Sequence, residues 1–174
     1  MTNEDNNFQI TLDYIRVRRD AFTNLDHAFS YAAQRKGRYS SIVTVLVIIL
    51  GACVSTKAIA DQVFGQVNAL NFVIYAVLGA LVTILTGLES AFKWSNKSAE
   101  LRSIATECRK SRYAIDTDLR RLLENAPENR QAQLNTAIAV LENANGELYR
   151  IENEGAKLGV DIPRDDLVIP SRTG

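Results

Sequence analysis

Hydrophobic and polar positions divide the chain into amphipathic stretches and two stretches without charge. Residues 39–56 carry no charged side chain, and neither do residues 62–88, whose apolar centre is 70–88. A helix rises ~1.5 Å per residue, so such a centre spans roughly 28 Å, close to the about 30 Å of a bilayer's hydrocarbon core. Residues 42–53 show no charged or amide side chain on any helix face, unlike a soluble helix. The pattern predicts transmembrane helices at about 39–57 and 68–92.

The charges that flank these segments predict an orientation. The positive-inside rule places both chain termini in the cytoplasm and the short connection between the spans outside. A signal peptide is the alternative for the first segment, because residues 58–60 (Ala-Ile-Ala) resemble a cleavage site. The region before it, roughly 40 residues with a helical pattern, is far longer than a signal peptide allows. The flanking basic residues are Arg35, Lys36, Arg38, Lys93, Lys97 and Arg102.

The first 38 residues form one predicted cytoplasmic amphipathic helix. Its apolar positions recur at spacings of three, four and seven, with one break at Arg18 and Arg19. Gly37 follows, and since glycine costs a helix about 1 kcal/mol relative to alanine, we expect a bend or hinge there. A second hinge is expected at the junction of residues 94–96. The apolar positions are Phe8, Leu12, Ile15, Phe22, Leu25, Phe29 and Ala32.

Residues 93–159 form a predicted cytoplasmic helical region with two further stripes. No stop signal follows the second span, so a continuous helix is expected from about Asn68 to Glu124. A second helix is expected to begin near Pro127, to carry Asn145 at an apolar seam position and to end at Gly159, before an extended tail at 160–174. The first stripe is Leu101, Ile104, Cys108, Ile115, Leu119 and Leu122, and the second is Leu134, Ile138, Leu141, Leu148 and Ile151.

The predicted fold is an all-α membrane protein: a two-span transmembrane helical hairpin with long cytoplasmic helices. The three cytoplasmic stripes need a common core, which one chain can supply. Two spans bury little surface on their own, so we expect a homo-oligomer that forms a larger bundle.

Composition excludes several classes of protein. The 20 basic and 20 acidic residues balance, which argues against nucleic-acid binding by bulk charge. Two cysteines and one histidine cannot build a four-ligand zinc site. No glycine-rich phosphate loop or nucleophile elbow occurs, and Cys108 lies on an apolar stripe, which is typical of an inert buried thiol. We therefore expect no enzyme activity, no cofactor and no metal.

One face of the second span is polar or small throughout. Small residues let helices approach closely and hydroxyls bond across them, so this stripe is either a helix–helix contact or, repeated by symmetry, a pore lining. Glu89 beside it is either one member of an acidic ring that favours cations or a carboxylate solvated by headgroups. A weaker stripe of Ser40, Thr44, Gly51 and Ser55 is predicted to pack on the second span. The main stripe is Asn68, Asn71, Tyr75, Gly79, Thr83, Thr86 and Ser90.

Three features resemble the SLATT family: the short connection at 57–68, the second span running unbroken into a cytosolic helix, and the exit sequence of residues 87–94 (GLESAFKW) followed by 99–101 (AEL). These are bacterial two-span effector domains associated with nucleotide-generating and nucleotide-sensing conflict systems. The resemblance covers about residues 15–124. It implies an anti-phage membrane effector that opens a pore or disrupts the inner membrane, in some systems on a cyclic-nucleotide signal or through a nucleotide-signalling partner protein.

A nucleotide would need cationic partners, and two clusters are candidates: Arg16, Arg18 and Arg19, and Arg109, Lys110 and Arg112. Such charges more often form a solvated face or bind anionic membrane lipid. The alternative function is a non-conducting membrane scaffold that docks a cytosolic partner through its helices. A phage-type holin fits less well, because about 120 of the 174 residues lie outside the spans.

Overall fold

A computed structural model describes the backbone of residues 3–64, 69–124 and 130–160, and the side chains of residues 5–55, 73–124 and 130–160. Within these ranges every element is an α-helix, as predicted: α1 (Asn3–Phe64), α2 (Ala69–Phe92), α3 (Trp94–Glu124) and α4 (Arg130–Lys157). The chain forms two compact units, Met1–Ala32 with Glu100–Gly174, and Ala33–Ala99. We call the first the helical bundle and the second the apolar hairpin.

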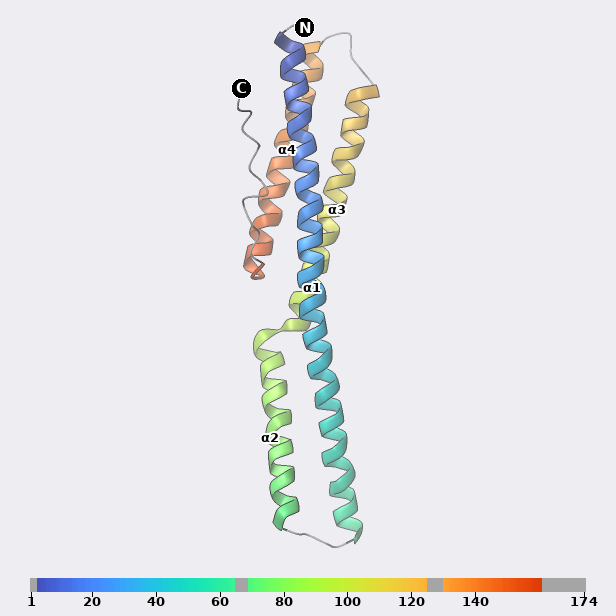
Figure 1. Cartoon of the computed structure of the whole chain (residues 1–174), viewed down its shortest axis with the longest axis vertical. Helices are drawn as coiled ribbons and strands as arrows, with labels where there is room; N and C mark the ends of the chain where they lie inside the picture. The colour runs from blue at the N-terminus through green and yellow to red at the C-terminus, as the bar shows by residue number, and fades with distance from the viewer. Residues whose placement is uncertain (1–2, 65–68, 125–129, 161–174) are drawn as a thin grey trace. The chain divides into compact units, whose positions relative to one another are not determined.

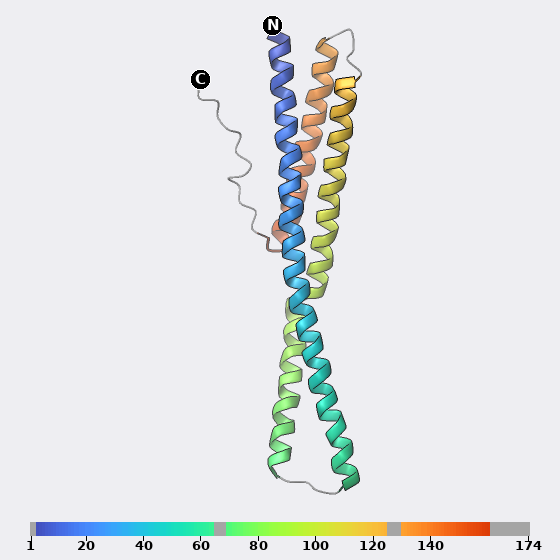
Figure 2. The same ribbon diagram turned by 45° about the vertical axis from the view of Figure 1, so that its right-hand side comes forward.

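The helical bundle packs the first part of α1 against α3 and α4, which lie side by side in both views (Figures 1 and 2). The predicted α1 stripe is buried except for Ala32, which is half-buried, and the whole α3 stripe is buried. Spacings of three and four residues recur along each helix, as in coiled-coil packing. The most completely buried large side chains in the bundle are Phe22, Phe29, Leu12, Ile15, Leu101, Ile151 and Cys108.

The prediction for α4 was wrong in its middle. Asn145 and Ile138 are exposed, whereas Ala137 and Ala144 are buried. The buried face of α4 follows a regular spacing of three and four residues through these two alanines. The sequence pattern instead placed Ile138 and Asn145, each one position later, on this face. Because alanine buries little area, its place in a seam carries a weak signal, while an exposed asparagine is solvated and needs no partner. The inward residues are Leu134, Ala137, Ala144, Leu148, Ile151 and Gly155.

Gly155 allows a close contact between α4 and α1 in the bundle. A methyl group at this position would overlap the ring of Phe29 from α1, so only glycine fits beside this buried aromatic side chain. Helix α4 ends at Lys157, and the predicted stop residue Gly159 caps it with a φ of 72°. The Val160 N–H donates to the Gly155 carbonyl and the Gly159 N–H to the Ala156 carbonyl, which is a Schellman motif.

Polar contacts tie α4 to the other two bundle helices. The Arg130 guanidinium donates from Nε to Asp5 at 3.0 Å and lies 4.5 Å above the ring of Phe8. Gln133 is buried and donates to the carbonyl of Leu122, near the end of α3. This bond satisfies one of the carbonyls that a helix end leaves without an intrahelical partner. The connection at 125–129, including Pro127, lies outside the described residues.

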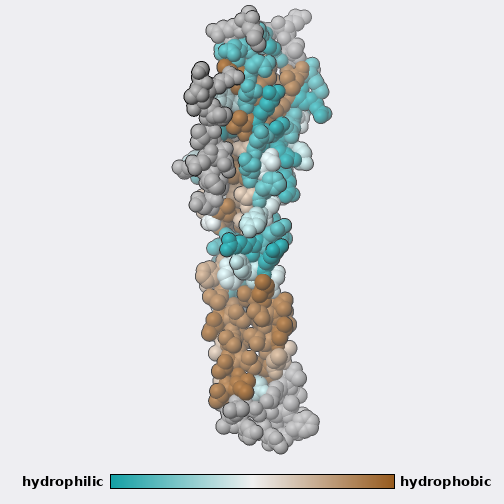
Figure 3. All heavy atoms as spheres, in the orientation of Figure 1, coloured by the Kyte–Doolittle hydropathy of each residue, from teal (hydrophilic) through white to brown (hydrophobic). Residues whose placement is uncertain are grey.

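The apolar hairpin pairs the second part of α1 with α2 (Figures 1 and 2). Two windows in these helices have a mean hydropathy of 1.8, long and apolar enough to span a membrane, and only 6 % and 0 % of their residues are buried. Ile48 is 63 % exposed and Ile84 57 %. Figure 3 shows the result as a continuous hydrophobic surface on the visible face of this unit.

A narrow face of each hairpin helix is half-buried. The predicted packing stripe of α1 was only half right, because Ser40 and Gly51 belong to this face but Thr44 and Ser55 are exposed. No side chain comes within 4 Å of a Cβ built at Gly51 or Gly79, so neither glycine serves a close helix approach here. The half-buried positions are Ser40, Val43, Val47, Leu50, Gly51 and Val54 in α1, and Tyr75, Leu78, Gly79, Val82, Leu85 and Glu89 in α2.

Of the two predicted hinges, the one at Gly37 is absent, whereas a helix break at Lys93 lies directly beside the one expected at residues 94–96. Helix α1 runs without interruption through Gly37, because a local cost of about 1 kcal/mol is small for a helix that continues on both sides. The expected continuous helix from Asn68 to Glu124 is instead divided at Lys93, which has a φ of 49°. A left-handed residue other than glycine costs roughly 1–2 kcal/mol, so other contacts must hold this conformation.

Candidate functional site

The break at Lys93 is stabilised by the carboxylate of Glu89, one turn earlier in α2. Its Oε1 accepts hydrogen bonds from the Ser95 backbone N–H at 3.2 Å and from Ser40 Oγ of α1 at 2.9 Å. The first of these bonds caps the first turn of α3, where a negative charge also complements the helix dipole. Oε2 is enclosed and accepts no hydrogen bond from the described residues. Glu89 therefore joins α1, α2 and α3 within the hairpin unit.

Neither interpretation of Glu89 from the sequence included this role. An acidic ring and a headgroup-solvated carboxylate both assume a side chain that points away from its own chain. The carboxylate instead turns back toward Ser40 and Ser95. Nothing in the sequence indicated that Lys93 adopts the left-handed conformation. Lysine has no special preference for that conformation, and only the surrounding contacts select it.

Aromatic and basic side chains surround this point. Trp94 stacks on Phe92 with ring centroids 5.2 Å apart and lies 6.2 Å from the ring of Tyr39. The Arg35 guanidinium lies 5.9 Å from the centre of the Tyr39 ring. Nearby, Ser98 Oγ donates to the carbonyl of Ala33 at 2.8 Å. These contacts bring the start of α3 against α1, so residues 33–40 and 89–99 form one local site.

The predicted polar stripe of α2 divides into parts. Tyr75 and Gly79 belong to the half-buried face, whereas Thr83, Thr86 and Ser90 are exposed. Thr83 donates to the Gly79 carbonyl and Thr86 to the Val82 carbonyl, both in their own helix. Asn68 and the side chain of Asn71 lie outside the described residues. The exposed part of the stripe is thus left uncovered by α1.

The cationic residues considered for a nucleotide lie in the helical bundle, and half of them pair with carboxylates. Arg16 bonds to Asp13 at 3.1 Å, and Arg19 to Asp20 at 2.8 Å. Arg109 of α3 donates from Nε to both oxygens of Asp26 of α1, at 3.0 and 2.9 Å. These carboxylates already neutralise the charge that a phosphate would need. Of the rest, Arg18 is half-buried, Lys110 is exposed, and Arg112 lies over the ring of Tyr113.

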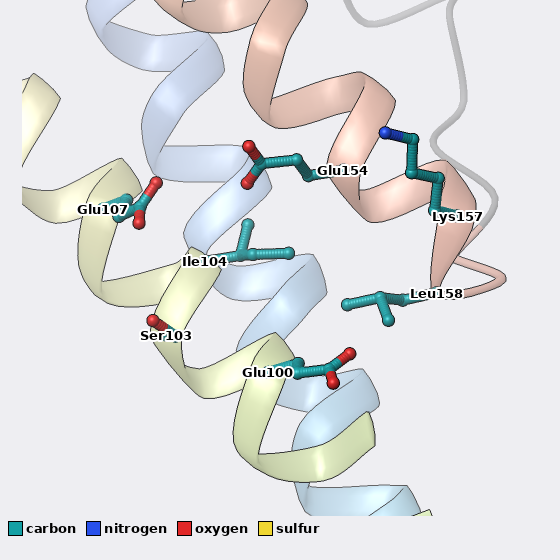
Figure 4. Close-up of a pocket in the computed structure, with 7 residues that line it drawn as sticks. All are labelled: Glu100, Ser103, Ile104, Glu107, Glu154, Lys157 and Leu158. Carbon is teal, nitrogen blue, oxygen red and sulfur yellow. The ribbon is translucent and has the colours of Figure 1, made fainter. Parts of the chain in front are cut away.

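A groove of about 370 Å³ opens between α3 and α4 of the bundle (Figure 4). Its polar lining is mainly acidic, and Glu107 and Glu154 both bond to Arg150 at 2.9 Å. Three carboxylates repel an anion, so this groove does not suit a nucleotide, and within the described ranges no metal-binding group of side chains occurs. It is lined by Glu100, Ser103, Ile104, Glu107, Glu154, Lys157 and Leu158.

Cys108 lies in the bundle core with no exposed surface. Burial, and secondarily the charge of Asp26, raise the pKa of its thiol to about 12. The reactive thiolate is therefore scarce at neutral pH, which agrees with the interpretation of a structural cysteine.

Comparison of the chain with protein-family models, with curated proteins and with solved structures found no match. The resemblance to the SLATT family accordingly stays a prediction.

Proposed function

We propose that the chain is an integral membrane protein of the bacterial inner membrane and acts as an oligomeric effector that permeabilises it on activation. The observation that carries the membrane assignment is the apolar hairpin, whose two hydrophobic windows are almost entirely exposed. Such a surface is costly in water at about 25 cal/mol per Å² but is matched to lipid chains. With the basic flanks inside, the helical bundle and both termini lie in the cytoplasm.

Assembly follows from the part of the stripe that α1 leaves uncovered. Thr83, Thr86 and Ser90 are exposed on α2 beside the half-buried face. Copies of the hairpin around an axis would bury this stripe or place it along a water-filled path. The proposed family supplies the trigger: a nucleotide signal, or a protein partner, that prefers the open state and shifts the population toward it.

The test is ion flux from liposomes reconstituted with the purified chain, alone and with a panel of cyclic nucleotides. Thr83→Leu and Thr86→Leu should abolish flux and leave the oligomer intact by chemical cross-linking. Thr44→Leu is the matched control, because Thr44 is also exposed and bonds to a carbonyl of its own helix, in α1. Full flux from both α2 variants would contradict a pore along this stripe.

A non-conducting scaffold is the second candidate, and one observation favours it. The hydroxyls of Thr83 and Thr86 are satisfied within α2, so the stripe needs no water and tolerates lipid or a neighbouring helix. This candidate expects no flux under any condition from protein that is inserted. Its partner would bind the bundle, and charge changes on that unit would release the partner without altering insertion.

A further inference from the structure

The hairpin unit carries a concentration of positive charge where its apolar surface ends. Residues 33–40 and 89–99 contain five basic residues and one acidic residue, Glu89, whose Oε1 already accepts two hydrogen bonds. We call the five the basic collar: Arg35, Lys36, Arg38, Lys93 and Lys97.

Collar residues of α1 are linked to the start of α3 through charge and ring contacts. Lys36 of α1 is half-buried, and burial together with the charge of Lys97 of α3 lowers its pKa. Arg35 reaches the Tyr39 ring, and Tyr39 in turn contacts Trp94, the residue after Lys93. An anion that contacts both lysines would offset the repulsion between them.

This charge differs from that of most bundle arginines, although Arg18, Arg102 and Arg112 of the bundle also take part in no ion pair among the described residues. Among the described residues, Arg38, Lys93 and Lys97 take part in no ion pair, whereas Arg16, Arg19, Arg109, Arg120, Arg121, Arg130 and Arg150 each bond to at least one carboxylate. Among the described residues, these three collar cations therefore have no carboxylate partner and can bind an external anion.

The chemistry beside the collar identifies the source of that anion. Ile42, Leu88 and Phe92 are exposed apolar side chains within a few residues of it, and Tyr39 and Trp94 are the aromatic types that lie at headgroup level. A free phosphate would use only the charges. A phospholipid would use both surfaces, its phosphate on the collar and its acyl chains on the apolar side chains. We propose that the basic collar is a binding site for the headgroup of an anionic phospholipid, a proposal that rests on the membrane insertion proposed above.

Trp94 is the only tryptophan of the chain and reports on this site directly. The full chain is reconstituted in vesicles of phosphatidylcholine mixed with phosphatidylglycerol. In one preparation part of the phosphatidylglycerol carries brominated acyl chains, and in the other the same amount of phosphatidylcholine does. Brominated chains quench tryptophan fluorescence on contact. Brominated phosphatidylglycerol should quench Trp94 more strongly. The binding constant of phosphatidylglycerol relative to phosphatidylcholine should fall about fivefold for each basic residue removed.

The decisive variants are Lys93→Gln with Lys97→Gln, which should lose the preference, and Lys93→Arg with Lys97→Arg, which should keep it. Lys110→Gln with Arg112→Gln removes the same charge from the bundle and should leave the preference unchanged. Far-ultraviolet circular dichroism verifies that each variant is folded. A preference that survives in the collar glutamine variant, or that disappears in the bundle variant, overturns the assignment to the collar.

Two further arms separate the remaining outcomes. Inorganic phosphate added to pure phosphatidylcholine vesicles should cause no saturable change in Trp94 fluorescence; a saturable change that the collar glutamines abolish would identify a free-anion site and overturn the lipid source. Equal quenching by both brominated lipids overturns the lipid site alone. Absence of quenching by either lipid contradicts insertion, and thus overturns the membrane proposal as well.

Discussion

The helical bundle and the apolar hairpin are both built from helices whose apolar residues recur every three or four positions. The bundle buries its apolar side chains, whereas the hairpin leaves most of them exposed. In the bundle, Phe22 and Ile151 are completely buried, and most arginines bond to carboxylates, as Arg109 and Arg150 do. In the hairpin, Ile48 and Ile84 are mostly exposed. Three cations of the collar, Arg38, Lys93 and Lys97, form no ion pair with any described carboxylate. The bundle buries its apolar stripes and pairs most of its arginines, whereas the hairpin leaves apolar surface exposed and, among the described residues, three cations without an ion pair.

The largest expected effect is the loss of a bundle core residue. Phe22→Ala should lower the free energy of unfolding by about 3–5 kcal/mol, because it leaves a cavity in a packed core. Ile48→Ala in the hairpin should change it by less than about 0.5 kcal/mol, since surrounding lipid or detergent replaces its contacts. Urea denaturation of the full chain in detergent, followed by circular dichroism, measures both. Equal losses would mean that the hairpin is packed like the bundle.

A pair of glycine substitutions in α4 should have opposite signs. Gly155→Ala forces a methyl group into the ring of Phe29 and should cost about 1–3 kcal/mol of stability, as overpacking does. Gly146 is exposed in the same helix and has open space at its Cβ, so Gly146→Ala should raise stability by up to about 1 kcal/mol. The same denaturation experiment applies. A neutral Gly155→Ala would show that Phe29 can move aside.

Within the hairpin, Glu89 should be the most sensitive polar residue. Glu89→Ala removes the acceptor for Ser40 and Ser95, and the loss of such a cap typically costs about 0.5–2 kcal/mol. The fluorescence maximum of Trp94 should shift, because Trp94 follows the residue at the break. Ser90→Ala, an exposed neighbour, is the control and should leave the spectrum unchanged. An unaltered spectrum in Glu89→Ala would mean that the Lys93 break holds without the cap.

The smallest effect concerns the Asp26–Arg109 pair of the bundle. Burial acts to raise the pKa of Asp26, but the hydrogen bonds from Arg109 and Ser30 outweigh it, so the pKa lies below the usual 3.8. A lowered pKa in the folded state stabilises the bundle above about pH 4, and this contribution is lost as the pH falls through the folded value. Asp26→Asn should therefore flatten the acid limb of the stability curve. A variant that follows the wild-type acid limb would contradict this role.

Most of the helices could be predicted from sequence periodicity, but the contacts at the candidate site could not. The α3 stripe through Leu101 and Cys108 was correct because large apolar residues at regular spacing leave a helix only one face to bury. Asn145 was misplaced because the buried face of α4 contains alanines, whose burial is only weakly indicated by the hydrophobic pattern of the sequence. The partners of Glu89 were missed because Ser40 lies 49 residues away, and no local pattern relates them.

The sequence by itself determined that this chain is helical, that two of its segments are long and apolar enough to span a membrane, and where α4 ends, since each follows from local composition and spacing. Only the tertiary structure decided that α1 continues through Gly37, that the chain turns at Lys93, and that Gly155 must remain glycine. In each of these cases the local preference amounts to about 1–2 kcal/mol, which hydrogen bonds and packing from distant residues readily exceed.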